Sequence, residues 1–516
     1  MSDSHDRLVA KLKRAHLLGT VSGLLGWDEQ VNLPPDSIDQ RSEQMALIAE
    51  LQHDAASDPE IGVLLAELEG RDGPPGRPRS KGDGAAVPPY LSDRQVVVRE
   101  ARKDYDRVTK LPADFVAERA RHVSRAYHAW VGAREAGDFA AFAPFLEKHL
   151  ELARREAELM GWGDRPYDYA LDKHDPGMTA GELTALFAEL KPGLLPLVRA
   201  IEASPVKAPR GLFKNFPVEQ QRLFLTEVAT ALGFNFRRGR IDVSPHPFCE
   251  GCGADIRMTT RFDTDNPLDA IFSAVHETGH GLYEQGLPLA HLGTPLGQPV
   301  GMGMHESQSR MWENQVARSQ SFWRYFEPRL RELTPGNLTG VSSEQLHLAM
   351  NAVKPTLIRV DADEVHYNLH VMLRFELERR LFAGELTVAG LPAAWNALSQ
   401  ELLGLTPPSD KLGVLQDVHW SGGAFGYFPS YCLGNMIAAQ FWFTVRDAQP
   451  GMDADFERGD FSRLLGWLRK NVHEHGRRFD TRELVRQVTG EELTPKYLLR
   501  YLHERYAPLY LRSKQG

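Results

Sequence analysis

Cysteine is scarce in this chain of 516 residues, which contains only Cys249, Cys252 and Cys432. Three cysteines cannot form the disulfide framework of a secreted protein, so we expect a reducing compartment. The first 14 residues are polar and charged, and they lack the apolar run of a secretory signal. These absences predict a cytoplasmic protein.

Membrane-length apolar runs and an excess of basic charge are also missing. The stretch 425–445 has no formal charge, but Pro429, Gly434, Asn435 and Gln440 interrupt it, which predicts a buried helix rather than a membrane span. Acidic residues number 69 and basic residues 60, giving a formal charge of −9. This balance argues against binding to nucleic acid or to an anionic membrane, because both need basic faces.

Alternating runs of β-branched residues are few, and apolar residues at helical spacing predominate. Helical patterns cover residues 181–203, 306–330, 461–470 and 495–511. Short strands are expected only near 239–243 and 255–261. The sequence therefore predicts a mostly α-helical protein with a small β element.

The clearest break in the helical pattern runs from Gly70 to Pro89, where 20 residues include five glycines and five prolines. This density predicts a surface loop, either a simple insertion or a functional lid. No other segment resembles a flexible linker between domains. We therefore expect a single domain over residues 1–516, with an N-terminal helical cap at about 1–150.

The strongest motif is H-E-x-x-H at residues 276–280. Because an α-helix turns by about 100° per residue, His276 and His280 lie about 40° apart on one helix face and can reach the same Zn²⁺. Glu277 would lie beside them, where it can take a proton from a water that the ion activates. Asn266 as N-cap, Pro267 at the first helical position and Gly286 at the end predict the helix that carries the motif. The alternative is two ordinary helix histidines.

A third metal ligand elsewhere in the chain would favour a metal site over two ordinary helix histidines. Gly286 occupies the position six residues after His280, where one class of metalloprotease has a third histidine. Glu306 opens the next amphipathic segment, 26 residues after His280. Two histidines and one glutamate leave an open fourth position, which is a catalytic rather than a structural geometry. His305 is expected to orient a ligand.

Six ordered motifs resemble the carboxypeptidase Taq family of metallocarboxypeptidases over nearly the whole chain. They are H-P-F at 246–248, D-I-R-M-T at 255–259, H-E-T-G-H at 276–280, H-E-S-Q at 305–308, I-R-V-D-A-D with Tyr367 at 358–367, and G-V-L-Q-D-V-H-W at 413–420. The Gly/Pro-rich segment and Cys249-Glu250-Gly251-Cys252 depart from the family pattern without touching the proposed ligands.

The resemblance implies a helical body with a deep central groove, similar to neurolysin and angiotensin-converting enzyme. It also implies a homodimer that removes C-terminal residues from peptides with broad specificity and disfavours C-terminal proline. We expect one Zn²⁺ per chain, although the same donor set accepts Co²⁺ or Mn²⁺. Gln308 is expected close to the metal.

A carboxypeptidase must hold a free C-terminal carboxylate, and the planar fork of arginine suits that task. Arg359 is our first candidate and Arg257 the second. The alternative for both is a structural ion pair, for instance with Asp363 or Asp255.

The oxyanion of the tetrahedral intermediate needs a further donor besides the metal. Tyr427 is preferred, with His419 and Tyr431 as further candidates, while aromatic core packing is the alternative for Tyr431. His246 is expected to contact substrate or orient a neighbour. Asp363 and Asp417 are expected to position other groups.

Several weaker signals have simpler explanations. Cys249 and Cys252 lack the second pair that a zinc ribbon needs. Four glycines at 293, 297, 301 and 303 are expected to let the chain run close to the metal site, and His473-Glu474-His475 to form a surface or capping cluster. Rival functions are an endopeptidase or dipeptidase on the same frame and a catalytically silent peptide-binding protein.

Overall fold

The computed structural model describes residues 3–72 and 91–511, which form a mostly helical body with one small sheet. The first helices are α1 (Ser4–Val31), α2 (Ile38–Ala56), α3 (Pro59–Asp72), α4 (Asp93–Thr109), α5 (Ala113–Ala136), α6 (Phe139–Leu159) and α7 (Pro166–Asp172). The following elements are α8 (Ala180–Ala203), α9 (Val218–Leu232), β1 (Gly239–Val243), β2 (Cys249–Cys252), β3 (Asp255–Thr260), α10 (Pro267–Gly286), α11 (Met302–Arg310) and α12 (Gln320–Leu333). The last are α13 (Ser343–Met350), α14 (Glu364–Ala383), α15 (Leu391–Leu403), α16 (Pro429–Ala448), α17 (Met452–Phe456), α18 (Ser462–Asn471), α19 (Thr481–Thr489) and α20 (Lys496–Tyr510). The prediction of a mostly α-helical fold is confirmed.

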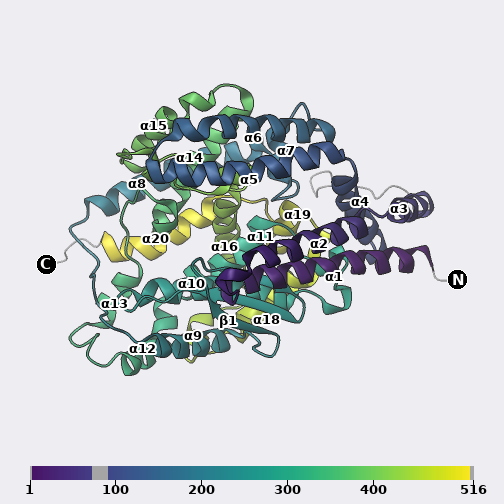
Figure 1. The fold of residues 1–516 in the computed structure, drawn as a ribbon. Helices are drawn as coiled ribbons and strands as arrows, with labels where there is room; N and C mark the ends of the chain where they lie inside the picture. Colours follow the sequence, from purple (N-terminus) through teal and green to yellow (C-terminus); the bar gives the residue numbers. More distant parts are fainter. Residues whose placement is uncertain (1–2, 73–90, 512–516) are drawn as a thin grey trace.

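Helix α16 runs through the middle of the molecule, with α5, α6 and α14 on one side and α9, α10 and α12 on the other (Figure 1). It begins four residues into the uncharged stretch that the sequence predicts as a buried helix, and nearly all of its residues are buried. A charged side chain there would lose its hydration without a partner, which explains the missing charges. Among the described residues, no helix is both long and apolar enough to span a membrane.

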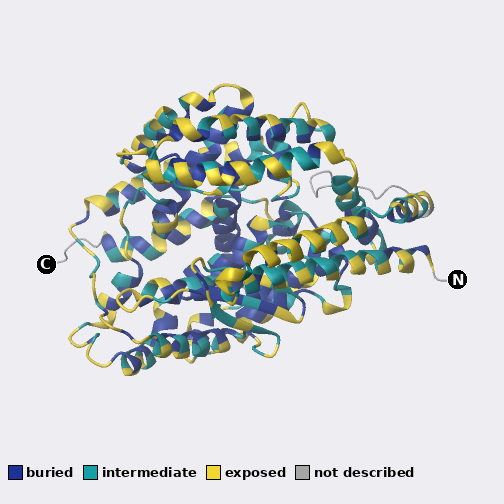
Figure 2. Ribbon diagram, in the orientation of Figure 1, coloured by how far each residue is buried: buried dark blue, intermediate teal, exposed yellow. Residues whose placement is uncertain are grey.

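The main hydrophobic core is continuous from Ala126 in α5 to Tyr510 in α20 (Figure 2). A separate small cluster joins α1, α3 and α4 around Leu8, Leu64 and Val98. Helices α5 and α6 thus contribute to the main core, whereas α1, α3 and α4 have a core of their own. The cap boundary near residue 150 stays a prediction.

The sheet has the strand order β1-β3-β2, with β1 parallel and β2 antiparallel to β3. Two of its strands were expected from sequence. The third, β2, is the Cys249–Cys252 stretch, which has no β-branched residue to signal a strand. Both thiols are free, and burial raises the pKa of Cys252 to about 11.

Three other sequence expectations need correction. The predicted helix 306–330 is interrupted by a π-helical turn at Met311–Val316 and a break before α12. Asn266 occupies the N-cap position of α10, but its side chain makes no capping hydrogen bond. His473 is not part of a surface cluster, because it is fully buried between Tyr283 and Gln308.

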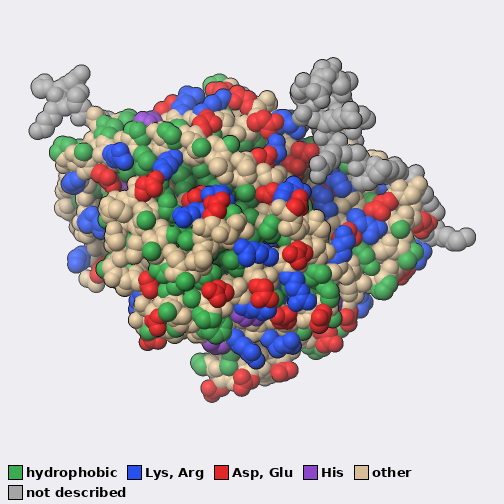
Figure 3. All heavy atoms as spheres, turned by 90° about the horizontal axis from the view of Figure 1, so that it is seen from above, with side chains coloured by type: hydrophobic (Ala, Val, Ile, Leu, Met, Phe, Trp, Pro, Cys, Tyr) green, Lys and Arg blue, Asp and Glu red, His purple; other side chains and the backbone are tan. Residues whose placement is uncertain are grey.

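The expected Gly/Pro-rich loop lies mostly outside the described residues. Its first three residues, 70–72, belong to α3. On the face seen in Figure 3, acidic and basic side chains are interspersed. The expectation that the protein does not bind nucleic acid stays a prediction.

Candidate metal centre

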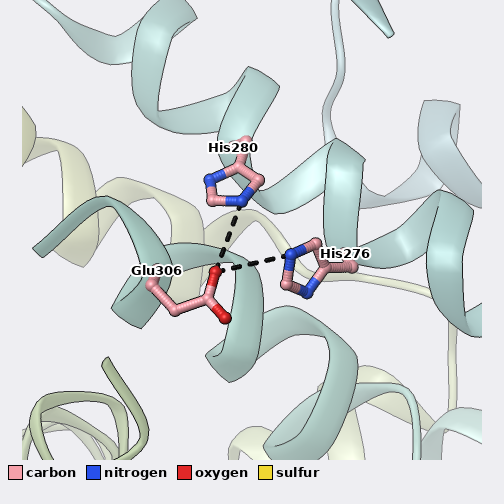
Figure 4. A group of neighbouring side chains, drawn as sticks. All are labelled: His276, His280 and Glu306. Carbon is pink, nitrogen blue, oxygen red and sulfur yellow. Dashed lines mark ion pairs between the residues drawn. The ribbon is translucent and has the colours of Figure 1, made fainter. Parts of the chain in front are cut away.

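His276 and His280 project from the same face of α10, with ring centroids 4.8 Å apart. Glu306, in the second turn of α11, directs one carboxylate oxygen at both rings (Figure 4). Its Oε2 lies 3.4 Å from His276 Nε2 and 3.5 Å from His280 Nε2. Among the described residues, these three form the one group whose donor atoms, all within 4.8 Å of one another, could hold a metal ion.

Each histidine has a partner at its other ring nitrogen. His276 Nδ1 donates to Glu313 Oε2 at 3.0 Å. His280 Nδ1 lies 2.6 Å from His305 Nδ1, and His305 Nε2 donates to Glu284 Oε1 at 3.0 Å. In the tautomer in which a neutral His305 donates from Nε2, its Nδ1 accepts from His280, and His280 then carries its proton on Nδ1. This tautomer leaves the Nε2 lone pair of His280 free on the side of Glu306, where a metal ion would be bound.

The charge states of the group suit a cation. Burial lowers the pKa of His280 to about 3, which keeps its imidazole neutral. Burial also lowers the pKa of His276, but the negative charges of Glu306 and Glu313 outweigh it and raise that pKa above its ordinary value. Burial opposes ionisation of Glu306, yet Arg310 and His276 hold its pKa well below the usual range. A metal cation would displace the proton on His276, so the donor set fits a divalent ion.

Glu277 is buried next to His276 on α10. Burial raises the pKa of its carboxyl to about 7. A carboxyl with that pKa can both accept and release a proton near neutral pH.

Arg359 lies in a short 3₁₀ turn before α14 and is buried among aromatic rings. Its Nε donates to Asp417 Oδ1 at 2.9 Å and its Nη1 to the Tyr367 hydroxyl at 2.7 Å. Asp417 also accepts from the fully buried Arg374 at 2.7 Å. Asp417 thus positions Arg359, whereas Asp363 caps the first turn of α14 at Val365 N.

His419, Tyr427 and Tyr431 form one aromatic cluster at the start of α16. His419 Nε2 lies 3.1 Å from the Tyr431 hydroxyl, and the His419 and Tyr427 rings are 5.3 Å apart. Burial, and then the negative charge of Glu306, raise the pKa of Tyr427 to about 12. His419 and Tyr427 also line a cavity of about 500 Å³, together with Val123 and Tyr127 of α5.

Within the part of the chain that the structure describes, three predicted site residues form no hydrogen bond or ion pair with the metal-site residues, Arg359 or the His419 cluster. Arg257 pairs with Asp255 at 2.9 Å and stacks over Trp27 at 4.2 Å. His246 is exposed between β1 and β2. Gln308 is fully buried, and its Oε1 lies 3.0 Å from His473 Nε2.

Sequence reasoning missed Glu313, Arg310, Glu284 and the role of Tyr367. Arg310 follows Glu306 by four residues, and Glu284 follows His280 by four. This helical spacing could have indicated both, because residues four apart share a face. No local spacing links Tyr367 to Arg310, although the guanidinium lies 4.6 Å from the Tyr367 ring centroid.

A helical body in which the donor atoms of two imidazoles and a carboxylate converge, with a buried glutamate beside them, is the arrangement of a metallohydrolase. The match to a known family shows which kind of metallohydrolase this is. Residues 7–506 match the family model described as carboxypeptidase Taq (M32) metallopeptidase, and the chain belongs to that family. It is a metallocarboxypeptidase, a hydrolase of peptide bonds.

Individual relatives agree with this assignment over full length. The thermostable carboxypeptidase 1 of Thermus thermophilus is 43% identical over 98% of this chain and 99% of its own. The carboxypeptidase 1 of Bacillus subtilis is 36% identical over 97% of both. The crystal structure of the M32 carboxypeptidase of Deinococcus radiodurans has a TM-score of 0.93 at 42% identity, covering 99% of this chain and 100% of that one.

Proposed function

We propose that this metallocarboxypeptidase uses Zn²⁺, held by His276, His280 and Glu306, to remove amino acids one at a time from free peptide C-termini. The observation that carries the proposal is the convergence of these three donors within 4.8 Å, beside a buried glutamate. The bound ion supplies a Lewis acid for the scissile carbonyl and lowers the pKa of water. Co²⁺ or Mn²⁺ could fill the same donor set.

Glu277 moves the proton in this mechanism. Its carboxylate accepts a proton from the attacking water and then delivers it to the nitrogen of the departing amino acid. The pKa of about 7 suits both transfers. The role follows from its place beside His276 on α10, so it does not depend on the identity of the metal.

Arg359 holds the C-terminal carboxylate of the peptide. Asp417 and Tyr367 engage its Nε and Nη1, and the described residues supply no hydrogen-bond partner for Nη2. That edge of the guanidinium is left for the substrate. Burial among aromatic rings strengthens the ion pair, because the effective dielectric constant is low there.

Tyr427 donates to the oxyanion as the carbonyl becomes tetrahedral. Burial keeps its hydroxyl protonated, since the pKa lies near 12. His419 lines the same cavity as Tyr427, and its Nε2 lies 3.1 Å from the Tyr431 hydroxyl. Oxyanion donors of this kind contribute about 3–4 kcal/mol to catalysis.

The test is mass spectrometry of a synthetic peptide incubated with the metal-loaded protein. We expect a ladder shortened by one residue at a time, and no reaction when the same peptide carries a C-terminal amide, because the amide removes the charge that Arg359 recognises. Cleavage of the amidated peptide would favour an endopeptidase. Metal-loaded protein that turns over neither peptide would favour a silent binding protein.

Broad specificity and the rejection of C-terminal proline are proposals that rest on the family resemblance. They are measured with a peptide set that differs only in the last residue. We expect hydrolysis of most members and slow hydrolysis of the proline member. Hydrolysis restricted to one side-chain class would contradict the proposed breadth.

A cytoplasmic homodimer is also proposed from the resemblance. The faces of α1 and α2 support it, because Leu17, Val21, Leu24, Leu47 and Leu51 are 40–60% exposed. Such an apolar face is typical of an interface. Light scattering on the purified protein should give twice the 57.9 kDa of one chain, and a mass of one chain at micromolar concentration would contradict the dimer.

A further inference from the structure

Arg310, the last residue of α11, lies between two buried carboxylates. Its Nε donates to Glu306 Oε1 at 2.7 Å, and its Nη1 donates to Glu313 Oε2 at 3.1 Å. The side chains of Glu306 and Glu313 are 8% and 11% exposed, and that of Arg310 is 15% exposed. One guanidinium therefore touches a proposed metal ligand and the partner of another.

The two oxygens of Glu306 have different surroundings. Oε2 faces both histidines and accepts a hydrogen bond from Ser309 Oγ at 2.9 Å. Oε1 has no dashed line to either histidine in Figure 4, and it accepts from Arg310 Nε at 2.7 Å. Rotating the carboxylate to bring both oxygens to an ion would break the bond to Arg310.

We propose that Arg310 is a positioning residue that restricts Glu306 to one-oxygen binding of the metal and holds Glu313 against His276. The Glu313 oxygen that accepts from Arg310 also lies 3.0 Å from His276 Nδ1. The same side chain thus orients two of the three proposed ligands. This inference rests on the proposed metal site.

The opposite face of Arg310 is fixed by Tyr367. The guanidinium carbon lies 4.6 Å from the ring centroid of Tyr367, a cation–π distance. The Tyr367 hydroxyl accepts from Arg359, which we propose to bind the substrate. Arg310 is thus held by two carboxylates and one aromatic ring, which leaves its fork little freedom.

One-oxygen binding has a chemical consequence. A carboxylate that binds through both oxygens uses an additional coordination position, and a catalytic site needs that position for substrate and water. A fixed positive charge on Oε1 also prevents this oxygen from competing for the ion. Arg310 therefore keeps the site open by geometry rather than by contact with substrate.

The experiment uses the full-length protein loaded with Co²⁺, whose visible absorption weakens as its coordination number rises. We expect Arg310→Gln to weaken this absorption relative to the wild type, because both oxygens of Glu306 become free to bind. Arg310→Lys, which can still bond one carboxylate oxygen, should restore part of the intensity. Unchanged absorption in Arg310→Gln would overturn the inference.

Arg318→Gln is the matched control. Arg318 is also largely buried and donates to Glu313 Oε1 at 3.2 Å, but its hydrogen bonds and ion pairs within the described structure do not include Glu306. We expect its Co²⁺ absorption to match the wild type. A change as large as that of Arg310→Gln would assign the effect to the loss of buried charge and overturn the positioning role.

X-ray absorption of the wild-type Co²⁺ protein tests the inference without any variant. Binding through one carboxylate oxygen of Glu306 supports the positioning role of Arg310. Binding through both oxygens overturns that role but leaves the proposed metal site standing. A wild-type protein that takes up no Co²⁺ overturns the proposed metal site and this inference together. The peptide ladder assay then shows separately whether the proposed activity stands.

Discussion

At the scale of single residues, Glu277 is the side chain whose replacement should abolish catalysis without abolishing metal binding. It lies next to His276 on α10 but is not one of the three converging donors. We predict that Glu277→Gln keeps the metal and lowers kcat by about 10²-fold or more, as loss of a general base does. Metal analysis and steady-state kinetics on the same preparation check this, and undiminished kcat at full metal content would refute the role.

The residues of the candidate site differ in how well the sequence predicted them. His276 and His280 come from one helical turn, so their spacing in the chain is also their spacing in space. Glu306 was predicted from its place at the start of the next amphipathic segment, 26 residues after His280. The partners Glu313 and Tyr367 depend on how separate elements dock, which no local spacing expresses.

At the scale of elements, α11 fits tightly between α10 and α16 because each neighbour presents a glycine. A Cβ added at Gly279 would lie 2.6 Å from Ser309 Cα, and one at Gly434 would lie 2.5 Å from Glu306 Cγ. A larger side chain at Gly279 would push α11 away from α10, and one at Gly434 would displace the side chain of Glu306 itself. The glycines therefore set the distance between the proposed ligands.

We predict that Gly434→Ala lowers the free energy of unfolding by about 1–3 kcal/mol, as overpacking does, and weakens metal binding as well. Urea unfolding and chelator competition measure the two effects. Gly466→Ala in α18 is the control, because its Cβ would meet no atom within 4 Å. That change should stabilise the protein slightly, by about 0.5–1 kcal/mol. Equal stability of the wild type and Gly434→Ala would contradict the tight fit.

The interruption after α11 shows where element prediction fails. Apolar residues at helical spacing continue through 306–330, but the chain adopts a π-helical turn at Met311–Val316. All six residues of that turn are buried, so tertiary packing stabilises the wider turn. Glu313 lies in it, and its contact with His276 could not be placed by α-helical counting.

At the scale of the whole molecule, the buried Glu378 forms hydrogen bonds with residues from distant parts of the chain. Its carboxylate accepts from the Tyr167 hydroxyl in α7, from Trp420 Nε1 and from Gly426 N in the segment before α16. Burial raises its pKa to about 7, although these hydrogen bonds and the charge of Arg374 act to lower it. The protonated carboxyl is therefore favoured in the folded state.

This raised pKa predicts a pH dependence of stability. Because the folded-state pKa lies above the ordinary value of 4.5, the stability that Glu378 contributes is fully present below pH 4.5 and is lost as the pH rises through about 7. From pH 5.5 to pH 8 the loss is about 2 kcal/mol. The difference in unfolding free energy between the wild type and Glu378→Gln should fall by this amount, measured by urea unfolding at both pH values. A difference independent of pH would contradict the raised pKa.

By itself, the sequence determined the helical class, the buried α16 and the pairing of His276 with His280, because periodicity and burial act along short stretches of chain. The tertiary structure alone decided which charges meet. Arg359 pairs with Asp417, which is 58 residues away in the chain, rather than with the nearby Asp363. Arg310 of α11 packs against Tyr367 of α14, although α12 and α13 lie between them in the sequence. Buried charges must be paired, and the partner is whichever one the packing of helices brings within reach.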